Sequence, residues 1–339
     1  MTATALVRPR QVPAGLRPVD ARVDMRQMAD LIALAFEGDL DSSGKAMLRD
    51  MRNFGRAGWL GWLAACLLLP EAAHPRGFVW IEESRLVGNA SLLRVEGFPR
   101  RWVLANVAVH PTWRRRGIAR GLTNACLAEA RREQADEVIL QVNSDRHAPQ
   151  ALYRDLGFVP QASRRIWTRR NNAPLASSPP AAGVRARRDE EWELDWELAR
   201  RQIPEGFIWP FPPRSSYYRP PRAAALGGAR YQHWLWWEDG RLLASLAALP
   251  RYVHDEWRLL LAVEPEGRGR VEEGLIRQAM RELPQQARLL LEYPAGQCDD
   301  LLSALGYLPG RCLTWMRLDL LASTAASGSG APPQSNAGA

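Results

Sequence analysis

Apolar and polar positions along the 339-residue chain change period repeatedly, which predicts an alternation of strands and helices. A short strand over 16–19 precedes Asp20, which can cap a helix that carries apolar residues at helical spacing up to Phe36. The pattern then predicts a hairpin over 78–81 and 86–94, a strand over 102–109, a helix over 116–133, a strand over 137–142, a helix over 148–156, and strand segments near 158 and over 166–169. The predicted order is therefore β-α-β-β-β-α-β-α-β.

The second half of the chain repeats this order. A strand over 184–187, a helix over 189–201 and a hairpin over 233–247 are followed by two segments that align with the first half. Leu259 to Pro265 aligns with the strand that ends at Pro111, and Leu305 to Pro309 aligns with Leu156 to Pro160, both at an offset of about 150 residues. We therefore expect two domains, at 14–170 and 184–320, joined by a linker at 171–183 and followed by a disordered tail at 323–339.

The strand that ends at Val109 runs into an Arg- and Gly-rich turn, and this turn opens the next helix. A helix start leaves backbone N–H groups without intrahelical partners, and the helix dipole adds positive character there. Glycine or alanine in the turn lets an anion approach the backbone closely. The segment from Asn106 to Leu122 therefore predicts a cradle for a pyrophosphate group.

The pattern Arg114-x-x-Gly117-x-Ala119 resembles the acyl-CoA-binding (R/Q)-x-x-G-x-(G/A) signature of the GNAT N-acetyltransferases. A second apolar strand and then Ala151-Leu152-Tyr153-Arg154-Asp155-Leu156-Gly157-Phe158 follow, similar to the other hallmark of that family. The resemblance implies an α/β fold (layered α+β) with two GNAT-like domains, each a mixed, mostly antiparallel central sheet flanked by helices. The β-α-β-β-β-α-β-α-β order agrees with it.

The resemblance also implies that an amine attacks the thioester of acetyl-CoA directly while a cleft between two parallel strands holds both. In this view the backbone of 107–109 pairs with the pantetheine arm and one strand N–H polarises the thioester carbonyl. The N–H groups of 115–120 hold the pyrophosphate, while the arginine side chains are as well explained by a solvated basic face as by a 3′-phosphate contact. The implied acetyl-CoA-binding residues are Val107, Ala108, Val109, Arg114, Arg115, Arg116, Gly117, Ile118, Ala119, Arg120, Asn143 and Arg146.

Tyr153 is the catalytic candidate, because a phenol is protonated at neutral pH and can give a proton to the departing CoA thiolate. The alternative is a tyrosine that only packs its ring under the sheet. The base is open, because Gln141 stands where the ribosomal-protein-alanine acetyltransferases carry Glu, and Gln cannot take a proton. Water, Asp145, Glu96 or another group can serve, or the amine needs none. Arg146 stands at the CoA-contacting Asn of that subfamily, and the nearby Asn143 can substitute for it.

The second repeat departs from the motif. Val271 and Glu273 align with Gly117 and Ala119, which places a β-branched side chain and a carboxylate where the anion should lie. Leu302 stands at the counterpart of Tyr153. We therefore expect one acetyl-CoA site per chain, in the first repeat, and a structural second repeat.

Composition adds few constraints. The net charge of +8 comes almost entirely from arginines scattered among acids, with Lys45 the sole lysine, so we expect no nucleic-acid partner. The four cysteines show no C-x-x-C spacing and no secretory signal precedes them, which suggests a cytoplasmic protein without a metal. The apolar run Trp59 to Leu69 is too short to span a bilayer and suggests a buried helix or pocket wall, with a membrane-surface contact as the alternative. Most of the 14 tryptophans should be core or inter-domain contacts, with an aromatic substrate wall as the alternative.

The predicted function is transfer of an acetyl group from acetyl-CoA to a primary amine of a small molecule or peptide by the first repeat. A non-catalytic acyl-CoA sensor or interaction module is the alternative, favoured by Gln141 and opposed by Tyr153. An aminoacyl or longer-chain acyl transferase on the same fold stays open. The protein is expected to be a monomer or a homodimer.

Overall fold

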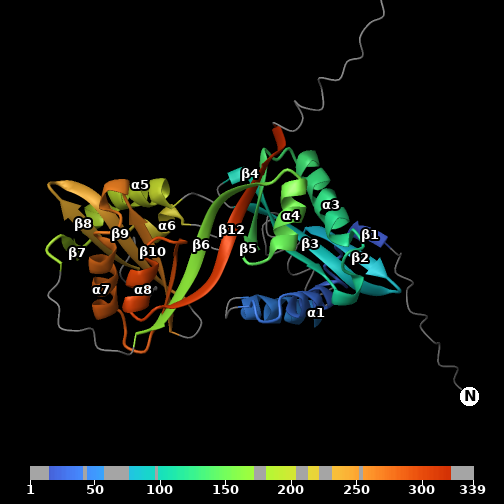
Figure 1. Ribbon diagram of the computed structural model, residues 1–339, viewed down its shortest axis with the longest axis horizontal. Helices are drawn as coiled ribbons and strands as arrows, with labels where there is room; N and C mark the ends of the chain where they lie inside the picture. The colour runs from blue at the N-terminus through green and yellow to red at the C-terminus, as the bar shows by residue number, and fades with distance from the viewer. Residues whose placement is uncertain are drawn as a thin grey trace, which may run out of the picture. The chain divides into compact units, whose positions relative to one another are not determined.

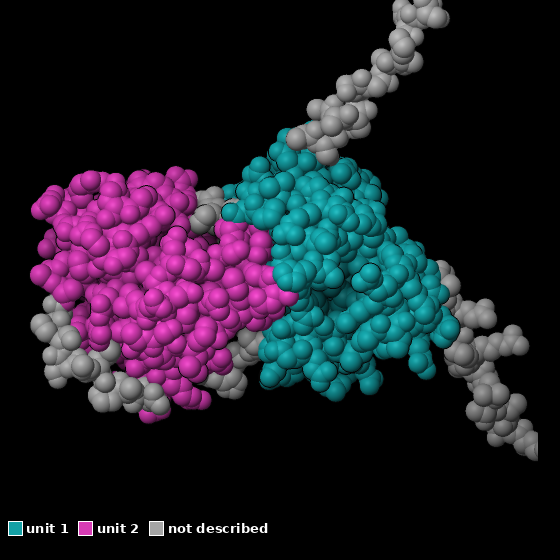
Figure 2. Space-filling view, viewed as in Figure 1, with its two compact units in different colours: residues 1–142, 146–161, 316–339 teal, residues 143–145, 162–315 magenta. Residues whose placement is uncertain are grey.

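The computed structural model describes residues 15–40, 44–56, 76–95, 98–171, 181–203, 213–220, 231–251 and 255–321. The chain divides into two compact units (Figure 2). Unit 1 takes its residues from 1–142, 146–161 and 316–339, and unit 2 from 143–145 and 162–315. The predicted tail and the apolar run at 59–69 lie outside the described residues, as do 172–180 of the predicted linker.

Unit 1 is a sheet with helices on both faces (Figure 1). Along the chain it contains β1 (Gly15–Pro18), α1 (Met25–Ala35), helical residues 44–56, β2 (Gly77–Glu82), β3 (Arg85–Val95), β4 (Phe98–Val109), α3 (Ile118–Arg132), β5 (Glu137–Asn143) and α4 (His147–Asp155). The strands are ordered β1-β2-β3-β4-β5 and only the β4–β5 pair is parallel among their ladders. These elements confirm the predicted order of strands and helices, apart from the helix at 44–56, which the pattern did not predict.

The period-2 pattern of the strands decides which helix covers which face. Val79 and Ile81 of β2 pack with α1, whereas Phe78 and Trp80 pack with α3 on the opposite face. Successive strand side chains point to opposite faces, so a strand that is apolar throughout must be covered on both. The α3 face also holds α4, through Tyr153.

Unit 2 repeats this layering. It contains β7 (Val184–Ala186), α5 (Trp192–Gln202), α6 (Ser215–Tyr218), β8 (Gln232–Glu238), β9 (Arg241–Pro250), β10 (Glu256–Val263), α7 (Glu272–Glu282), β11 (Arg288–Pro294) and α8 (Asp299–Ala304). Leu249 and Leu260 pack with α5 and α6, whereas Leu246 and Leu261 pack with α7 and α8. The β10–β11 pair is parallel, as β4–β5 is in unit 1.

Two long strands each belong to both units. β6 (Val159–Arg170) begins in unit 1 and pairs antiparallel with β11 in unit 2, where Trp167 is part of the core. β12 (Leu308–Asp319) begins in unit 2 beside β6 and ends in unit 1, where Met316 and Leu318 are core residues. Each core therefore contains side chains from a strand that begins in the other unit.

No helix within the described ranges is both long and apolar enough to cross a membrane.

Candidate functional site

The parallel pair β4–β5 provides the main feature of the candidate site. The paired register ends at Leu104 and Leu140, although β4 continues to Val109 and β5 to Asn143. Beyond this point no strand in the described part of the chain pairs with the β5-facing edge of β4. A strand edge without a partner presents N–H and C=O groups that can pair with an extended ligand, as predicted for 107–109.

A β-bulge lies in this part of β4. Asn89 pairs with Ala108 and Ser91 with Ala105, so Asn106 and Val107 together oppose the single residue between Asn89 and Ser91. Asn106 has φ of 53°, which is unusual for a strand residue that is not glycine. The buried Asn89 side chain donates from Nδ2 to the Asn106 carbonyl at 2.6 Å and holds the bulge. The sequence analysis missed both asparagines, and two Asn residues within apolar strands were the available signal.

The turn between β4 and α3 has the geometry of an anion cradle. Arg115 and Gly117 have φ of 63° and 78°, so left-handed residues alternate along the turn and direct successive N–H groups outward. Among the described residues, no carbonyl accepts from the N–H groups of 115–117, and all three residues are exposed. A Cβ on Gly117 would meet nothing within 4 Å, so the space above the backbone is open. The predicted pyrophosphate-binding residues are thus arranged in a way that fits such a group.

The arginine side chains around this cradle differ in the hydrogen bonds, stacking contacts and ion pairs that they make. Arg114 donates from Nε to the Val109 carbonyl at 3.2 Å, and Arg116 stacks on Trp113 with 4.5 Å from Cζ to the ring centroid. Arg120 pairs with Asp155 at 2.9 Å on the surface. Arg115 makes no side-chain hydrogen bond or ion pair with any described residue, so its guanidinium is available to a phosphate. Ile118 is 3% exposed and belongs to the core, so its N–H alone can contribute.

Tyr153 lies on α4 with its ring in the unit 1 core, 7% exposed, and packs edge-on against Phe158 with 5.8 Å between the ring centroids. Burial raises the pKa of the phenol, and Cys126 adds to the rise. Burial likewise raises the pKa of the Cys126 thiol to about 12. The phenol therefore stays protonated at neutral pH, as a proton donor must, and no described residue hydrogen-bonds its hydroxyl.

The residues that follow Leu140 provide no strong base. The Gln141 side-chain nitrogen is buried and has no hydrogen-bond partner in the described part of the chain. Asp145 is exposed and donates its N–H to Asn143 Oδ1 at 2.9 Å, and Arg146 pairs with Asp39. Glu96 lies outside the described residues. The roles of Asn143 and Arg146 toward CoA stay predictions.

The equivalent turn of unit 2 is closed by its own residues. Gly269 keeps the first left-handed position with φ of 77°, but Val271, which replaces Gly117, has φ of −102°. The N–H groups of Arg270 and Val271 both donate to the Gly267 carbonyl, at 3.0 and 3.2 Å. The β9–β10 ladder also runs from Trp257 to Val263 without the bulge of unit 1.

The carboxylate that fills the unit 2 turn is Glu272 and not Glu273, so the sequence expectation for Glu273 was wrong. Glu272 is 1% exposed, and its Oε1 accepts from the Gly269 N–H at 2.9 Å and from the Tyr293 hydroxyl at 3.0 Å. Glu273 instead pairs with Arg277 one helical turn later, at the surface. A side-chain carboxylate thus takes the place that an external anion would occupy.

Comparisons with known proteins agree with this geometry. Residues 46–158 match the profile of the Acetyltransferase (GNAT) family. A tandem GNAT protein from the clavulanic acid biosynthesis pathway is 20% identical, with 90% of this chain and 98% of that chain covered at a TM-score of 0.53. A GCN5-related N-acetyltransferase from Sphaerobacter thermophilus is 14% identical, with 90% and 95% covered at a TM-score of 0.59. No curated protein matches the chain. The structural likeness shows the fold over both units.

Proposed function

The chain contains a GNAT-family acetyltransferase domain within residues 46–158, and from this premise we propose that unit 1 transfers an acetyl group from acetyl-CoA to a primary amine. The acceptor is proposed to be a small molecule or a peptide. The observation that carries the proposal is the exposed turn at 115–117, whose N–H groups have no partners among the described residues.

In this proposal the turn holds the pyrophosphate of acetyl-CoA, with Arg115 as the available cation. The β4 edge beyond Leu104 pairs with the pantetheine arm, because β5 no longer pairs with it there. The bulge at Asn106 changes the direction of the strand groups next to the turn. A strand N–H at 107–109 is proposed to stabilise the oxyanion that develops on the thioester carbonyl.

The chemical step is direct attack. The amine nitrogen forms a bond to the thioester carbonyl carbon, the C–S bond breaks, and the sulfur leaves as a thiolate. Tyr153 is proposed to donate its phenolic proton to that sulfur, and the proton that the amine loses goes to water or to the phenolate. Holding the two reactants together supplies much of the rate.

The binding part of the proposal is tested by calorimetry with acetyl-CoA on the full chain. We expect one molecule bound per chain because, of the two equivalent turns that the structure describes, the one in unit 1 has N–H groups without described partners and the one in unit 2 has not. Two molecules per chain, or none, would contradict the site assignment. A panel of amines, assayed by release of free CoA thiol, then separates an enzyme from a non-catalytic acyl-CoA sensor. Tight binding of acetyl-CoA with no thiol released on any amine favours the sensor. The uncharged Gln141 is the observation that supports the sensor.

A further inference from the structure

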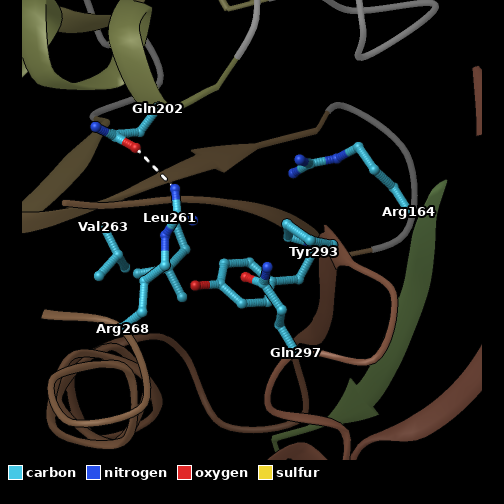
Figure 3. A pocket seen from close by; sticks show the side chains of 8 residues that line it. Arg164, Gln202, Leu261, Val263, Arg268, Tyr293 and Gln297 are labelled. Atoms are coloured by element: carbon cyan, nitrogen blue, oxygen red, sulfur yellow. Dashed lines mark hydrogen bonds between the residues drawn. The ribbon is translucent and has the colours of Figure 1, made fainter. Parts of the chain in front are cut away.

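Unit 2 contains a cavity of about 60 Å³ at the position where its parallel strands stop pairing (Figure 3). The β10–β11 register ends at Leu259 and Leu291, and the strands then continue separately. Leu261 and Val263 line one side of the cavity, and Tyr293 lines another. A volume of this size holds a few water-sized groups, so it suits a small ligand and not a pantetheine arm.

One end of the cavity carries a buried cation. Arg164 of β6 is 5% exposed and donates from Nη2 to the Glu292 carbonyl oxygen at 2.8 Å. Its Nε lies 3.3 Å from Glu292 Oε1 but forms no hydrogen bond there or with another described residue. Arg258 lies 3.8 Å from the other Glu292 oxygen. The Nε–H of Arg164 is thus a buried donor whose hydrogen bond no described residue accepts.

The other end carries a second cation at the closed turn. Arg268 donates from Nη2 to Gln202 Oε1 at 3.2 Å, and both side chains line the cavity with Gln297 (Figure 3). The nearby Glu272 carboxylate is already engaged by the Gly269 N–H and the Tyr293 hydroxyl. Gln202 also donates from Nε2 to Glu264 Oε2 at 2.6 Å. Among the lining side chains, the groups that can still serve a ligand are therefore the remaining guanidinium donors of Arg164 and Arg268 and the Gln297 amide.

We propose that this unit 2 cavity binds a small oxyanion, a carboxylate or a phosphate, between Arg164 and Arg268. Guanidinium groups match the paired oxygens of both anions, and a cation at each end suits one compact anion better than an apolar guest. The proposal is independent of acetyl transfer by unit 1, since all lining residues belong to unit 2.

The test is calorimetric titration of the full chain with inorganic phosphate and, separately, with malonate, each at constant ionic strength set by chloride. Arg268→Gln is expected to weaken binding of the preferred anion about 10-fold, because it removes a charged donor. Arg270→Gln is the matched control, since Arg270 lies on the same turn but pairs with Glu238 at the surface, outside the cavity. Arg164→Lys keeps the buried charge and should weaken binding because it removes the two-pronged geometry.

The titrations are repeated in Gly117→Glu, so that anion binding at the unit 1 turn is not counted. Phosphate binding that depends on Arg268 but not on Arg270 supports a phosphate ligand, and the same result with malonate supports a carboxylate. Binding of neither anion, or equal loss in the Arg268 and Arg270 variants, overturns the proposal. Neither result depends on whether acetyl-CoA binds unit 1, so failure of this proposal and failure of the proposed function are distinguishable.

Discussion

The turn at 114–118 in unit 1 and the turn at 268–272 in unit 2 follow equivalent strands, but they use their N–H groups differently. In unit 1 two left-handed residues leave the N–H groups of 115–117 exposed and without partners among the described residues. In unit 2 the groups of 269–271 are bonded to Glu272 or to the Gly267 carbonyl. The same strand-to-helix turn can therefore bond its own N–H groups without any loss of fold, which is why we expect an anion site in unit 1 alone.

Two substitutions account for most of the change. Gly117 tolerates a φ of 78°, whereas the aligned Val271 adopts −102°, since a β-branched residue is strained in the left-handed region. Glu272, aligned with Ile118, then accepts from the Gly269 N–H, so that a carboxylate of the chain itself occupies this turn. A buried carboxylate at a helix start is stabilised by the same N–H groups and dipole that would bind phosphate.

The largest expected effect comes from placing a carboxylate in the unit 1 turn. Gly117→Glu should lower acetyl-CoA affinity at least about 100-fold, because a carboxylate facing a diphosphate costs several kcal/mol and each 1.4 kcal/mol is tenfold. Calorimetry measures the loss. Gly240→Glu is the matched control for backbone strain, since Gly240 has φ of 75° and equally open surroundings in a unit 2 turn. An unchanged affinity in Gly117→Glu would remove the turn from the site.

The catalytic part of the comparison rests on Tyr153 and its counterpart Leu302, which is 0% exposed in the unit 2 core. Tyr153→Phe should lower turnover about 10²- to 10⁴-fold, the range for losing a general acid, with the KM for acetyl-CoA nearly unchanged. Thiol release on an identified amine measures both constants. Tyr307→Phe, a buried tyrosine of unit 2, should leave turnover unchanged. If the two variants behaved alike, Tyr153 would be a packing residue only.

The order of elements and both hallmark segments were predictable, because periodicity and the Arg/Gly turn are local signals. The covering of both sheet faces by helices was also predictable, because apolar runs such as Val79 to Ile81 imply packing on both sides of a sheet. The passage of β6 and β12 between units was not predictable, because Trp167 and Met316 are apolar strand residues whichever sheet they join. Glu272 was missed because two adjacent glutamates at a helix start look alike in sequence, and only the helix phase decides which one turns inward.

A smaller effect is expected from emptying the unit 2 turn. Glu272→Ala leaves the Gly269 N–H and the Tyr293 hydroxyl without their acceptor and should lower the free energy of unfolding by about 1–3 kcal/mol. Urea unfolding, with hydrogen exchange to assign the loss to unit 2, measures it. Glu273→Ala removes only a surface pair and should change stability by less than about 0.5 kcal/mol. Equal losses of unfolding free energy in the two variants would contradict the role of Glu272 as the acceptor that occupies the unit 2 turn.

The smallest expected effect concerns an arginine–carboxylate pair that both units have between their first strand and first helix. In unit 1 Arg17 of β1 pairs with Asp24 just before α1, and in unit 2 Arg185 of β7 pairs with Glu191 just before α5. The Arg185 hydrogen bond, helped by the Arg188 N–H, lowers the pKa of Glu191 from 4.5 to about 2, although burial opposes the shift.

A carboxyl whose folded-state pKa is depressed stabilises the fold above its unfolded pKa and loses that stabilisation as pH falls. The stability that Glu191 contributes should therefore be complete above about pH 4.5 and disappear between pH 4.5 and about 2. Glu191→Gln should lower the Tm modestly at neutral pH, and the difference from the parent protein should shrink through that window as acid is added. Glu193→Gln, on the exposed face of the same first helical turn, should follow the parent curve throughout. A constant gap for Glu191→Gln across the window would mean that the pair contributes through packing and not through its charge.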